Sequence, residues 1–281
     1  MFYSYHSLTA ALAAAGIEEA DWEARLLLER FALVSAATLL ADRHRVFDSP
    51  TLDAAVDQRL TRYPLQYVLG EWDFCGLTFT VNEACLIPRA DTEILVEEAI
   101  RLLPRNARVA DLCTGSGCIA VTTLRYRPDV TATALELFPK TLELATANAA
   151  RNGVADRFTP LQADLLGDGV AALGDSAPFD AILSNPPYIP TSVVEGLSPE
   201  VKNEPHAALD GGEDGLTFYR ALLRDYAPMV KAGGCILLEM GYDQAAALQG
   251  LVAEYLPHAT VQIIRDLGGN DRVTKITLPR A

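Results

Sequence analysis

The chain contains 281 residues, of which 50% are hydrophobic and 21% are charged. This composition supplies enough apolar side chains for a packed core and excludes global disorder, and the length predicts one large domain or two smaller ones. Acidic residues outnumber basic residues by 37 to 23, which gives a formal net charge of −14. A protein that grips nucleic-acid backbones needs a basic face, so this balance argues against such a role.

Cysteine and histidine spacing gives no sign of a metal site or a disulfide framework. The five cysteines form no C-x-x-C pair, and the four histidines lie far apart in the sequence. We therefore expect free thiols and no bound metal. The apolar stretch at residues 8–17 has no basic residue before it, and no apolar run approaches the ~20 residues that a membrane span requires. We expect a cytosolic protein without membrane contacts.

Residues 1–65 predict a helical domain. Apolar residues recur at helical spacing on three segments. The predicted buried faces are Leu8, Leu12 and Ala15; Trp22, Leu26, Phe31 and Val34; and Leu52, Val56 and Leu60. Asp48-Ser49-Pro50 separates two of these segments and is suited to cap the later one. Helices alone are expected up to about residue 63.

The pattern changes at residues 66–88. Residues 71–74 and 77–81 are short, aromatic and β-branched runs with Cys75-Gly76 between them. Two such runs around a glycine turn are typical of a β-hairpin. We interpret this segment as a hairpin linker between the helical domain and the remainder of the chain.

From residue 89 to residue 281, predicted helices and strands alternate. The helices are expected at 91–103, 139–151, 216–230 and 244–256, and the strands at 109–113, 130–136, 158–162, 179–184, 234–240, 261–265 and 272–278. Alternation of this kind predicts a mostly parallel sheet with helices on both faces. No helix fits between the last two strands, so these two are expected to pair antiparallel.

A glycine-rich turn follows the first of these strands. Glycines at positions 115 and 117 permit a sharp turn and close approach to a ligand, and the helix that follows offers free N–H donors. Residue 120 is alanine, and no Lys-Ser/Thr pair is present, so the turn departs from the dinucleotide and phosphate-loop patterns. Taken alone, this motif is equally compatible with a ligand-binding turn and with a tight turn that binds no ligand.

Three acids indicate which ligand would bind. Glu136 ends the next strand, where it can accept hydrogen bonds from both ribose hydroxyls of an adenosine, although a surface acid is the alternative. Asp111 closes the first strand, where it can meet a cationic ammonium group. Asp164 follows a third strand and would accept from the adenine amine or cap a helix. A ligand with a ribose, a positive amino-acid end and no phosphate is S-adenosylmethionine.

A second motif, Asn185-Pro186-Pro187-Tyr188, follows the strand at 179–184. The prolines stiffen the loop and remove N–H donors. The Asn185 side-chain oxygen and the Pro186 carbonyl can each accept one proton of an amide NH₂, and Tyr188 offers a flat face. Two acceptors stabilise the positive charge that grows on a poorly nucleophilic nitrogen during methylation. We therefore take Asn185, Pro186 and Tyr188 as catalytic and the whole motif, Pro187 included, as substrate-binding; a plain proline-rich turn is the alternative.

At these motifs the chain resembles class I S-adenosylmethionine-dependent methyltransferases. More narrowly, it resembles the HemK/PrmC family, which methylates the glutamine of the Gly-Gly-Gln motif in peptide-chain release factors. The resemblance covers nearly the whole chain and extends to residues 64–70, 86–93, 204–216 and 266–272. It implies a Rossmann-like, seven-stranded, mostly parallel sheet with an N-terminal helical domain, and S-adenosylmethionine as the cofactor.

The resemblance also implies roles for individual residues. Those that would line the cofactor, besides Asp111 and Asp164, are Cys113, Thr114, Gly115, Ser116, Gly117, Glu136, Leu165 and Asn185. The motif from Asn185 to Tyr188 would hold the substrate glutamine. The chain departs from the family at Ala90, where proline is common, and at Leu165, where an aromatic residue is frequent.

Three functions compete on the sequence alone. They are glutamine N5 methylation of release factors, adenine methylation of DNA or RNA, and non-catalytic binding. Adenine-N6 DNA methyltransferases share the Asn-Pro-Pro-Tyr tetrapeptide, but the acid excess and the lack of a spare base-reading domain disfavour nucleic acid. Intact Asp111, Gly115, Gly117, Glu136 and Asn185 disfavour an inactive protein. We expect a release factor as the partner, docked by the helical domain and an acidic face, and a monomeric enzyme.

Overall fold

The computed structural model describes residues 2–280, and these form two compact units. One unit consists of the residues up to Glu71 together with Ser198–Asn203. The other consists of Trp72–Leu197 and the chain from Glu204 onward. The first division lies within the segment that the sequence marks as a linker. The sequence gives no sign that residues 198–203, which follow the Asn-Pro-Pro-Tyr motif, return to the smaller unit.

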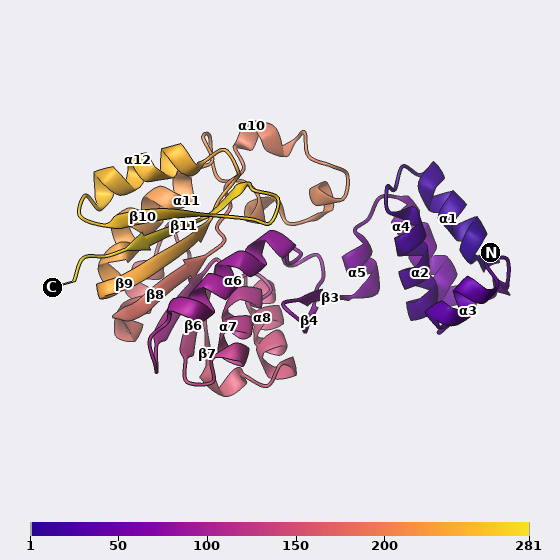
Figure 1. Ribbon diagram of the computed structural model, residues 1–281, viewed down its shortest axis with the longest axis horizontal. Coiled ribbons are helices and arrows are strands. Elements are labelled where there is room, and N and C mark those ends of the chain that lie inside the picture. The colour runs from indigo at the N-terminus through magenta and orange to yellow at the C-terminus, as the bar shows by residue number, and fades with distance from the viewer. Residues whose placement is uncertain (1, 281) are drawn as a thin grey trace. The chain divides into compact units, whose positions relative to one another are not determined.

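The smaller unit is mainly helical (Figure 1). Its helices are α1 (Tyr5–Ala14), α2 (Ala20–Phe31), α3 (Ala36–Ala41), α4 (Pro50–Leu60) and α5 (Leu65–Leu69). Two short strands, β1 (Tyr3–Ser4) and β2 (Val46–Phe47), pair antiparallel. The expectation of helices alone was therefore wrong here, because two-residue strands are too short to leave a periodic pattern in a sequence.

The helices of this unit bury apolar stripes that the sequence predicts only in part. Leu8, Leu12, Leu52 and Val56 are fully buried, as predicted. On α2, however, Trp22 is 39% exposed. The buried residues of that helix are instead Ala20, Glu23, Ala24, Leu27 and Leu28. The prediction for this face was wrong for Trp22, whereas Leu26, Phe31 and Val34 are partly buried and pack against the core.

Serine caps fix where α1 and α4 begin. Ser49 Oγ accepts a hydrogen bond from the Leu52 amide at 3.3 Å, and Pro50 occupies the first turn of α4. The predicted cap is thus confirmed. Ser4 caps α1 in the same way and exchanges hydrogen bonds with Ser7. Both arrangements satisfy amide groups that a helix start leaves without partners.

A charged network holds residues 198–203 within the smaller unit. Arg59 is 3% exposed, and its Nε and Nη2 atoms donate to Glu23 Oε2 and Oε1 at 2.6 and 3.0 Å. Its Nη1 atom donates to Glu200 Oε1 at 3.1 Å. Arg62 donates to both oxygens of Glu200, at 2.5 and 2.9 Å. Buried charges persist only when they are paired, so Glu200 is a fixed anchor for this segment.

The larger unit begins with the predicted hairpin, β3 (Glu71–Phe74) and β4 (Leu77–Thr80), which is confirmed. Its sheet contains β5 (Arg108–Leu112), β6 (Thr131–Glu136), β7 (Phe158–Gln162), β8 (Phe179–Ser184), β9 (Val230–Glu239), β10 (Thr260–Arg265) and β11 (Asp271–Thr277). Its helices are α6 (Ala90–Leu102), α7 (Cys118–Tyr126), α8 (Pro139–Arg151), α9 (Gly169–Leu173), α10 (Thr191–Val194), α11 (Thr217–Ala221) and α12 (Ala245–Tyr255).

The strand order of the seven-stranded sheet is β10-β11-β9-β8-β5-β6-β7. Pairs from β9 through β7 are parallel, and β11 is antiparallel to both of its neighbours. The predicted mostly parallel sheet and its antiparallel end are confirmed. The chain leaves β5 toward β7 and then returns to β8 on the other side of β5. In open α/β sheets, ligands bind at the carboxyl ends of the strands where the order reverses in this way.

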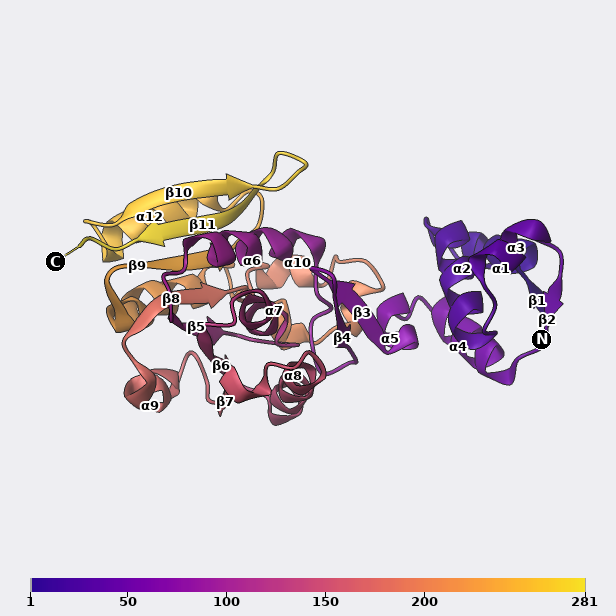
Figure 2. The same ribbon diagram turned by 60° about the horizontal axis from the view of Figure 1, so that its bottom comes forward.

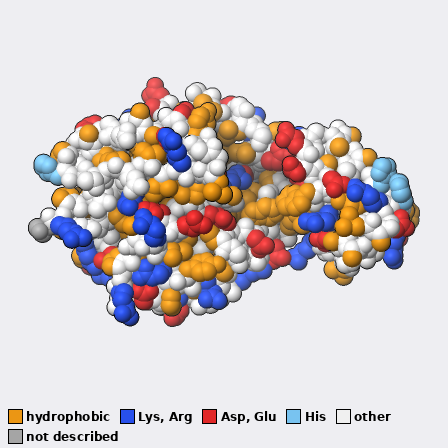
Figure 3. Space-filling view, viewed as in Figure 1, with side chains coloured by type: hydrophobic (Ala, Val, Ile, Leu, Met, Phe, Trp, Pro, Cys, Tyr) orange, Lys and Arg blue, Asp and Glu red, His pale blue; other side chains and the backbone are white. Residues whose placement is uncertain are grey.

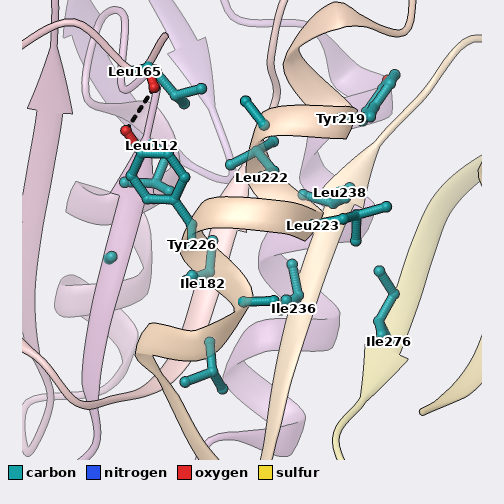
Figure 4. Close-up of a cluster of buried hydrophobic side chains, with 14 of the residues drawn as sticks. Leu112, Leu165, Ile182, Tyr219, Leu222, Leu223, Tyr226, Ile236, Leu238 and Ile276 are labelled. Carbon is teal, nitrogen blue, oxygen red and sulfur yellow. Dashed lines mark hydrogen bonds between the residues drawn. The ribbon is translucent and has the colours of Figure 1, made fainter. Parts of the chain in front are cut away.

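Helices cover both faces of the sheet (Figures 1 and 2). One face carries α6, α7 and α8, and the other carries α11, α12 and a π-helical segment, η5 (Leu222–Tyr226). Figure 4 shows Leu222 and Tyr226 of η5 packed against strand residues such as Ile182 and Leu238. Because side chains alternate along a strand, Glu239 points to the opposite face, toward α6.

Two boundaries differ from the prediction on this face. The predicted helix at 216–230 is divided into α11, η5 and a 3₁₀ turn at Ala227–Met229, where Pro228 cannot continue the hydrogen-bonding pattern. Strand β9 begins at Val230, which pairs with Phe179, and runs through Gly233 and Gly234. No helix of the described part of the chain is long and apolar enough to cross a membrane.

Candidate active site

A cavity of about 250 Å³ lies in the larger unit where the strand order reverses. Its walls come from the segments after β5, β6, β7 and β8, and from the residues that precede α6. The predicted cofactor residues that line it are Cys113, Thr114, Gly115, Ser116, Glu136, Asp164, Leu165 and Asn185. The fold thus gathers all of the predicted set except Asp111 and Gly117 around one space.

The two glycines of the turn have different surroundings. Gly115 and Gly117 both have left-handed backbone, with φ of +56° and +80°. A Cβ atom on Gly115 would meet nothing within 4 Å, so the space beside it is open to a ligand. A Cβ atom on Gly117 would lie 3.2 Å from the Ala145 Cβ atom of α8. Gly117 therefore permits helix packing, and Gly115 permits ligand approach.

Asp111 lies beneath this turn and is fully buried. Its Oδ2 atom accepts hydrogen bonds from Thr114 Oγ1 at 2.6 Å and from the Ala120 amide at 3.1 Å. Burial nevertheless raises the pKa of Asp111 to about 7. The side chain ties the turn to the start of α7 and does not line the cavity. Its contact with a ligand ammonium group stays a prediction.

Glu136 stands at the edge of the cavity, held in one orientation. Its Oε2 atom accepts from the Gly115 amide and its Oε1 atom from the Phe138 amide, both at 3.1 Å. Burial raises the pKa of this carboxyl group, which is 8% exposed. Each oxygen keeps capacity for a further hydrogen bond, so the carboxylate can receive a diol.

The segment after β7 forms another wall. Asp164 Oδ1 accepts from the Leu166 amide at 2.8 Å, which closes a turn, while helix α9 begins only at Gly169. The helix-cap alternative for Asp164 was therefore wrong. Tyr226 of η5 is fully buried and donates from its hydroxyl to the Leu165 carbonyl at 2.7 Å (Figure 4). That bond fixes the backbone of the residue that lines the cavity.

The Asn-Pro-Pro-Tyr loop borders the cavity through Asn185 and Pro187. Asn185 Nδ2 donates to Thr92 Oγ1 of α6 at 3.2 Å. Pro186 and Tyr188 are outside the described lining, and the Tyr188 hydroxyl donates to Glu239 Oε1 across a long 3.5 Å. Residues of α6 and β9 thus hold the motif, and the Asn185 side chain borders the cavity.

The glycines at 211 and 215 support the same loop by close packing. A Cβ atom on Gly211 would lie 2.7 Å from Tyr188 Cα, and one on Gly215 would lie 2.4 Å from the Tyr188 carbonyl oxygen. Gln244 Nε2 donates to that carbonyl at 2.9 Å. Only glycine permits so close a backbone approach, so this segment is a rigid support for Tyr188.

Two buried acids beside the cavity were missed from the sequence. Glu204 accepts a hydrogen bond from the Ile87 amide at 2.9 Å and forms an ion pair with Arg89. Glu239, 1% exposed, ends β9 at the edge where β6 ends with Glu136. An acid that closes a run of buried strand residues was a usable signal for Glu239. Glu204 lies in the segment 204–216 that carries the family resemblance, but its contacts with Ile87 and Arg89 join residues far apart in the chain, and the sequence did not predict them.

Charge and metal-binding residues are dispersed elsewhere. On the face seen in Figure 3, acidic and basic side chains alternate, and no broad field of one sign is visible. Among residues 2–280, no three His, Cys, Asp or Glu side chains form a group that could hold a metal ion.

Comparison with known proteins agrees with this geometry. Residues 5–70 match the family model "PrmC N-terminal domain", and residues 90–197 match "Methyltransferase small domain". A release factor glutamine methyltransferase of Geobacter sulfurreducens is 41% identical over 85% of this chain and 84% of its own length. A second one, from Cereibacter sphaeroides, is 42% identical over 96% of this chain and 95% of its own length.

The fold is also found among solved structures. A methyltransferase from Pyrococcus furiosus superimposes with a TM-score of 0.54 at 17% identity, covering 74% of this chain and 91% of its own. This likeness concerns the fold alone, and the predicted class I methyltransferase architecture is confirmed. Because release factor glutamine methyltransferases are 41 and 42% identical to this chain over most of its length, the chain belongs to their family.

Proposed function

We propose that this protein transfers a methyl group from S-adenosylmethionine to the side-chain amide nitrogen, N5, of the glutamine in the Gly-Gly-Gln motif of peptide-chain release factors. The observation that carries the proposal is the position of Asn185. Its amide borders a cavity whose other wall holds the Glu136 carboxylate and the open face of Gly115. The names of the relatives supply the substrate.

The residues around the cavity fit S-adenosylmethionine. The Glu136 carboxylate is suited to the ribose hydroxyls, and Gly115 leaves room for backbone approach. Leu165 and Leu137 offer apolar surface for the adenine, in place of the aromatic residue that the family often has. When bound, S-adenosylmethionine supplies a methyl carbon that its sulfonium makes electrophilic.

The Asn-Pro-Pro-Tyr loop would hold the glutamine amide. Asn185 Oδ1 and the Pro186 carbonyl each accept one amide proton, which fixes the NH₂ group and directs its nitrogen lone pair. As positive charge grows on that nitrogen, the same two acceptors stabilise it. Tyr188 would pack on the planar amide group, and its backbone is held by Gln244 and by the close packing of Gly211 and Gly215.

We extend the proposal to partner and setting. The helical unit would bind the release factor, and the net charge of −14 suits a basic protein surface. We propose that the enzyme acts as a monomer in the cytosol, without direct contact to nucleic acid or membrane. If sedimentation at assay concentration shows an oligomer, the proposal of a monomer is wrong.

A labelling experiment tests the function. The protein is incubated with methyl-labelled S-adenosylmethionine and one of three substrates: release factor, release factor with Gln→Ala in its Gly-Gly-Gln motif, or DNA. We expect label on the first alone, at N5 of the glutamine by mass spectrometry. Label on DNA and not on release factor would overturn the proposal and favour adenine methylation.

The Asn185→Ala variant tests the mechanism separately. We expect it to lose turnover by at least about 100-fold, as on removal of a group that stabilises transition-state charge. Cofactor binding should persist in part, because the other walls of the cavity are unchanged. Turnover near that of the wild type would contradict the role of Asn185.

A further inference from the structure

The Asn185 amide belongs to a short series of polar groups that ends on a buried acid. Asn185 Nδ2 donates to Thr92 Oγ1 at 3.2 Å, and Thr92 in turn neighbours the Glu239 carboxyl group, whose pKa it lowers. Thr92 is 2% exposed and Glu239 1% exposed. Glu239 Oε2 has no hydrogen-bond partner among the described residues. A buried acid with one unpaired oxygen lowers the stability of the fold, and its presence therefore indicates a role at the site.

The direction of these hydrogen bonds decides which way the amide faces. An ionised carboxylate only accepts hydrogen bonds, so we take the single Thr92 hydroxyl proton to turn toward the neighbouring Glu239 carboxylate. The Thr92 oxygen can then only accept from Asn185, and it takes the NH₂ side of the amide. Asn185 has no other side-chain hydrogen bond among the described residues, so Oδ1 is left for a ligand.

We propose that Thr92 and Glu239 are positioning residues, which hold the Asn185 amide with its oxygen toward the substrate nitrogen. The inference rests on the proposed function, since it concerns the same amide substrate. With a neutral group at position 239, the Thr92 hydroxyl can turn and donate to Asn185 Oδ1. The amide then presents NH₂ to the substrate NH₂, and two donors face each other without an acceptor.

The charge on Glu239 makes this orientation dependent on pH. Burial raises the pKa of Glu239 to about 7, against the lowering effects of Thr92 and Arg272. The titratable and charged groups that face it are Asp91 on α6, Cys118 on α7, Tyr188 in the loop, Tyr219 on α11 and Arg272 on β11. Turnover should therefore rise as pH increases through about 7, as Glu239 loses its proton.

The variants Thr92→Val, Thr92→Ser and Glu239→Gln test the inference, with Thr122→Val as the matched control. Thr122 is also a fully buried threonine, but it lies in α7 and its hydroxyl has no partner in the described chain. The turnover number, kcat, is measured from pH 6 to 9 with release factor and S-adenosylmethionine both saturating. The dissociation constant of S-adenosylmethionine is measured by calorimetry.

We expect Thr92→Val and Glu239→Gln each to lower kcat by about 10- to 100-fold, because even a small misplacement of a reacting group can cost up to about 100-fold. Cofactor affinity should stay within about threefold, since neither change touches Glu136 or the glycine turn. Thr92→Ser should restore kcat, and Thr122→Val should match the wild type. Glu239→Gln should also remove the rise in kcat near pH 7.

Each contrary result has a definite meaning. If the wild type methylates release factor and both Thr92→Val and Glu239→Gln keep its kcat, the positioning role is wrong while the proposed function stands. If Thr92→Ser is as impaired as Thr92→Val, the residue acts through packing and the inference fails. A wild type that labels no release factor overturns the proposed function itself. The Thr92 variants keep the test decisive even if Glu239→Gln folds poorly.

Discussion

Glu204 lies 115 residues after Arg89 in the chain, yet its carboxylate pairs with the Arg89 guanidinium and accepts from the Ile87 amide. The Glu204 side chain is 1% exposed, and that of Arg89 is 36% exposed. One buried acid thereby holds the segment before α6, whose residues form a wall of the cavity. The contact joins two segments that are distant in sequence.

The first prediction concerns this contact. Glu204→Gln keeps the size of the side chain but removes its charge, so the hydrogen bonds to Arg89 and Ile87 weaken. We expect the free energy of unfolding in urea to fall by about 1–3 kcal/mol, with weaker cofactor binding. Asp225→Asn is the control, because its pair with Arg224 is on the surface and should change stability by under about 1 kcal/mol. Equal losses in both variants would contradict the argument.

The glycine turn gives a second prediction from a matched pair. Alanine in left-handed backbone costs about 1–2 kcal/mol at either position. Gly117→Ala also crowds Ala145, so it should lower the unfolding free energy more than Gly115→Ala does. Gly115→Ala instead places a methyl group into the open cavity and should weaken cofactor binding relative to its stability loss. Denaturation and calorimetry on both variants check this separation, and a reversed order of the two effects would refute it.

The third prediction is that Glu136→Gln weakens the binding of S-adenosylmethionine. A neutral amide is a poorer acceptor for two ribose hydroxyls than a carboxylate, and the loss of a charged hydrogen bond is about 1.5–3 kcal/mol. The dissociation constant from calorimetry should rise about 10- to 100-fold. Glu143→Gln, an exposed residue of the neighbouring helix α8, should leave affinity unchanged. Unchanged affinity in Glu136→Gln would remove the ribose role.

The fourth prediction links Glu239 to stability. Its pKa is about 7 in the folded protein against 4.5 ordinarily, so between these values the folded chain holds a proton that the unfolded chain has lost. The free energy of unfolding therefore falls as pH rises through this window, and the full penalty of about 3 kcal/mol is present above pH 7. Glu239→Gln should be more stable than the wild type at pH 8, and the gain should shrink toward pH 5.

The comparison of Glu239→Gln with the wild type isolates the effect of the Glu239 carboxyl group. Asp111, whose pKa is also raised to about 7, is present in both and cancels from the difference. Unfolding curves in urea at pH 5, 6, 7 and 8 measure the difference directly. A constant difference over that range would show that Glu239 does not titrate there. Greater stability together with lower turnover would identify Glu239 as an acid that the site retains for function.

The amino-acid sequence by itself determined the sheet and most of the cavity lining. Strands such as Arg108–Leu112 and Phe179–Ser184 are almost continuous buried runs, and in a parallel sheet all their carboxyl ends meet at one edge. Motifs at those ends, such as Gly115 and Asn185, therefore converge without further information. Local chemistry was enough because each motif directly follows its own strand.

Only the tertiary structure decided how these motifs are supported. In the folded structure, Asp111 lies beneath the glycine turn, Thr92 and Glu239 lie on the α6 side of Asn185, and Glu204 contacts Arg89. The fold also returns Glu200 to the helical unit. Apart from the Asp111 contacts, which span three to nine residues, these contacts join residues far apart in the chain, and no local pattern pairs one partner with the other. Their identity follows from which side chains the packed layers bring within hydrogen-bonding distance, and a one-dimensional pattern of apolar and polar residues does not contain that information.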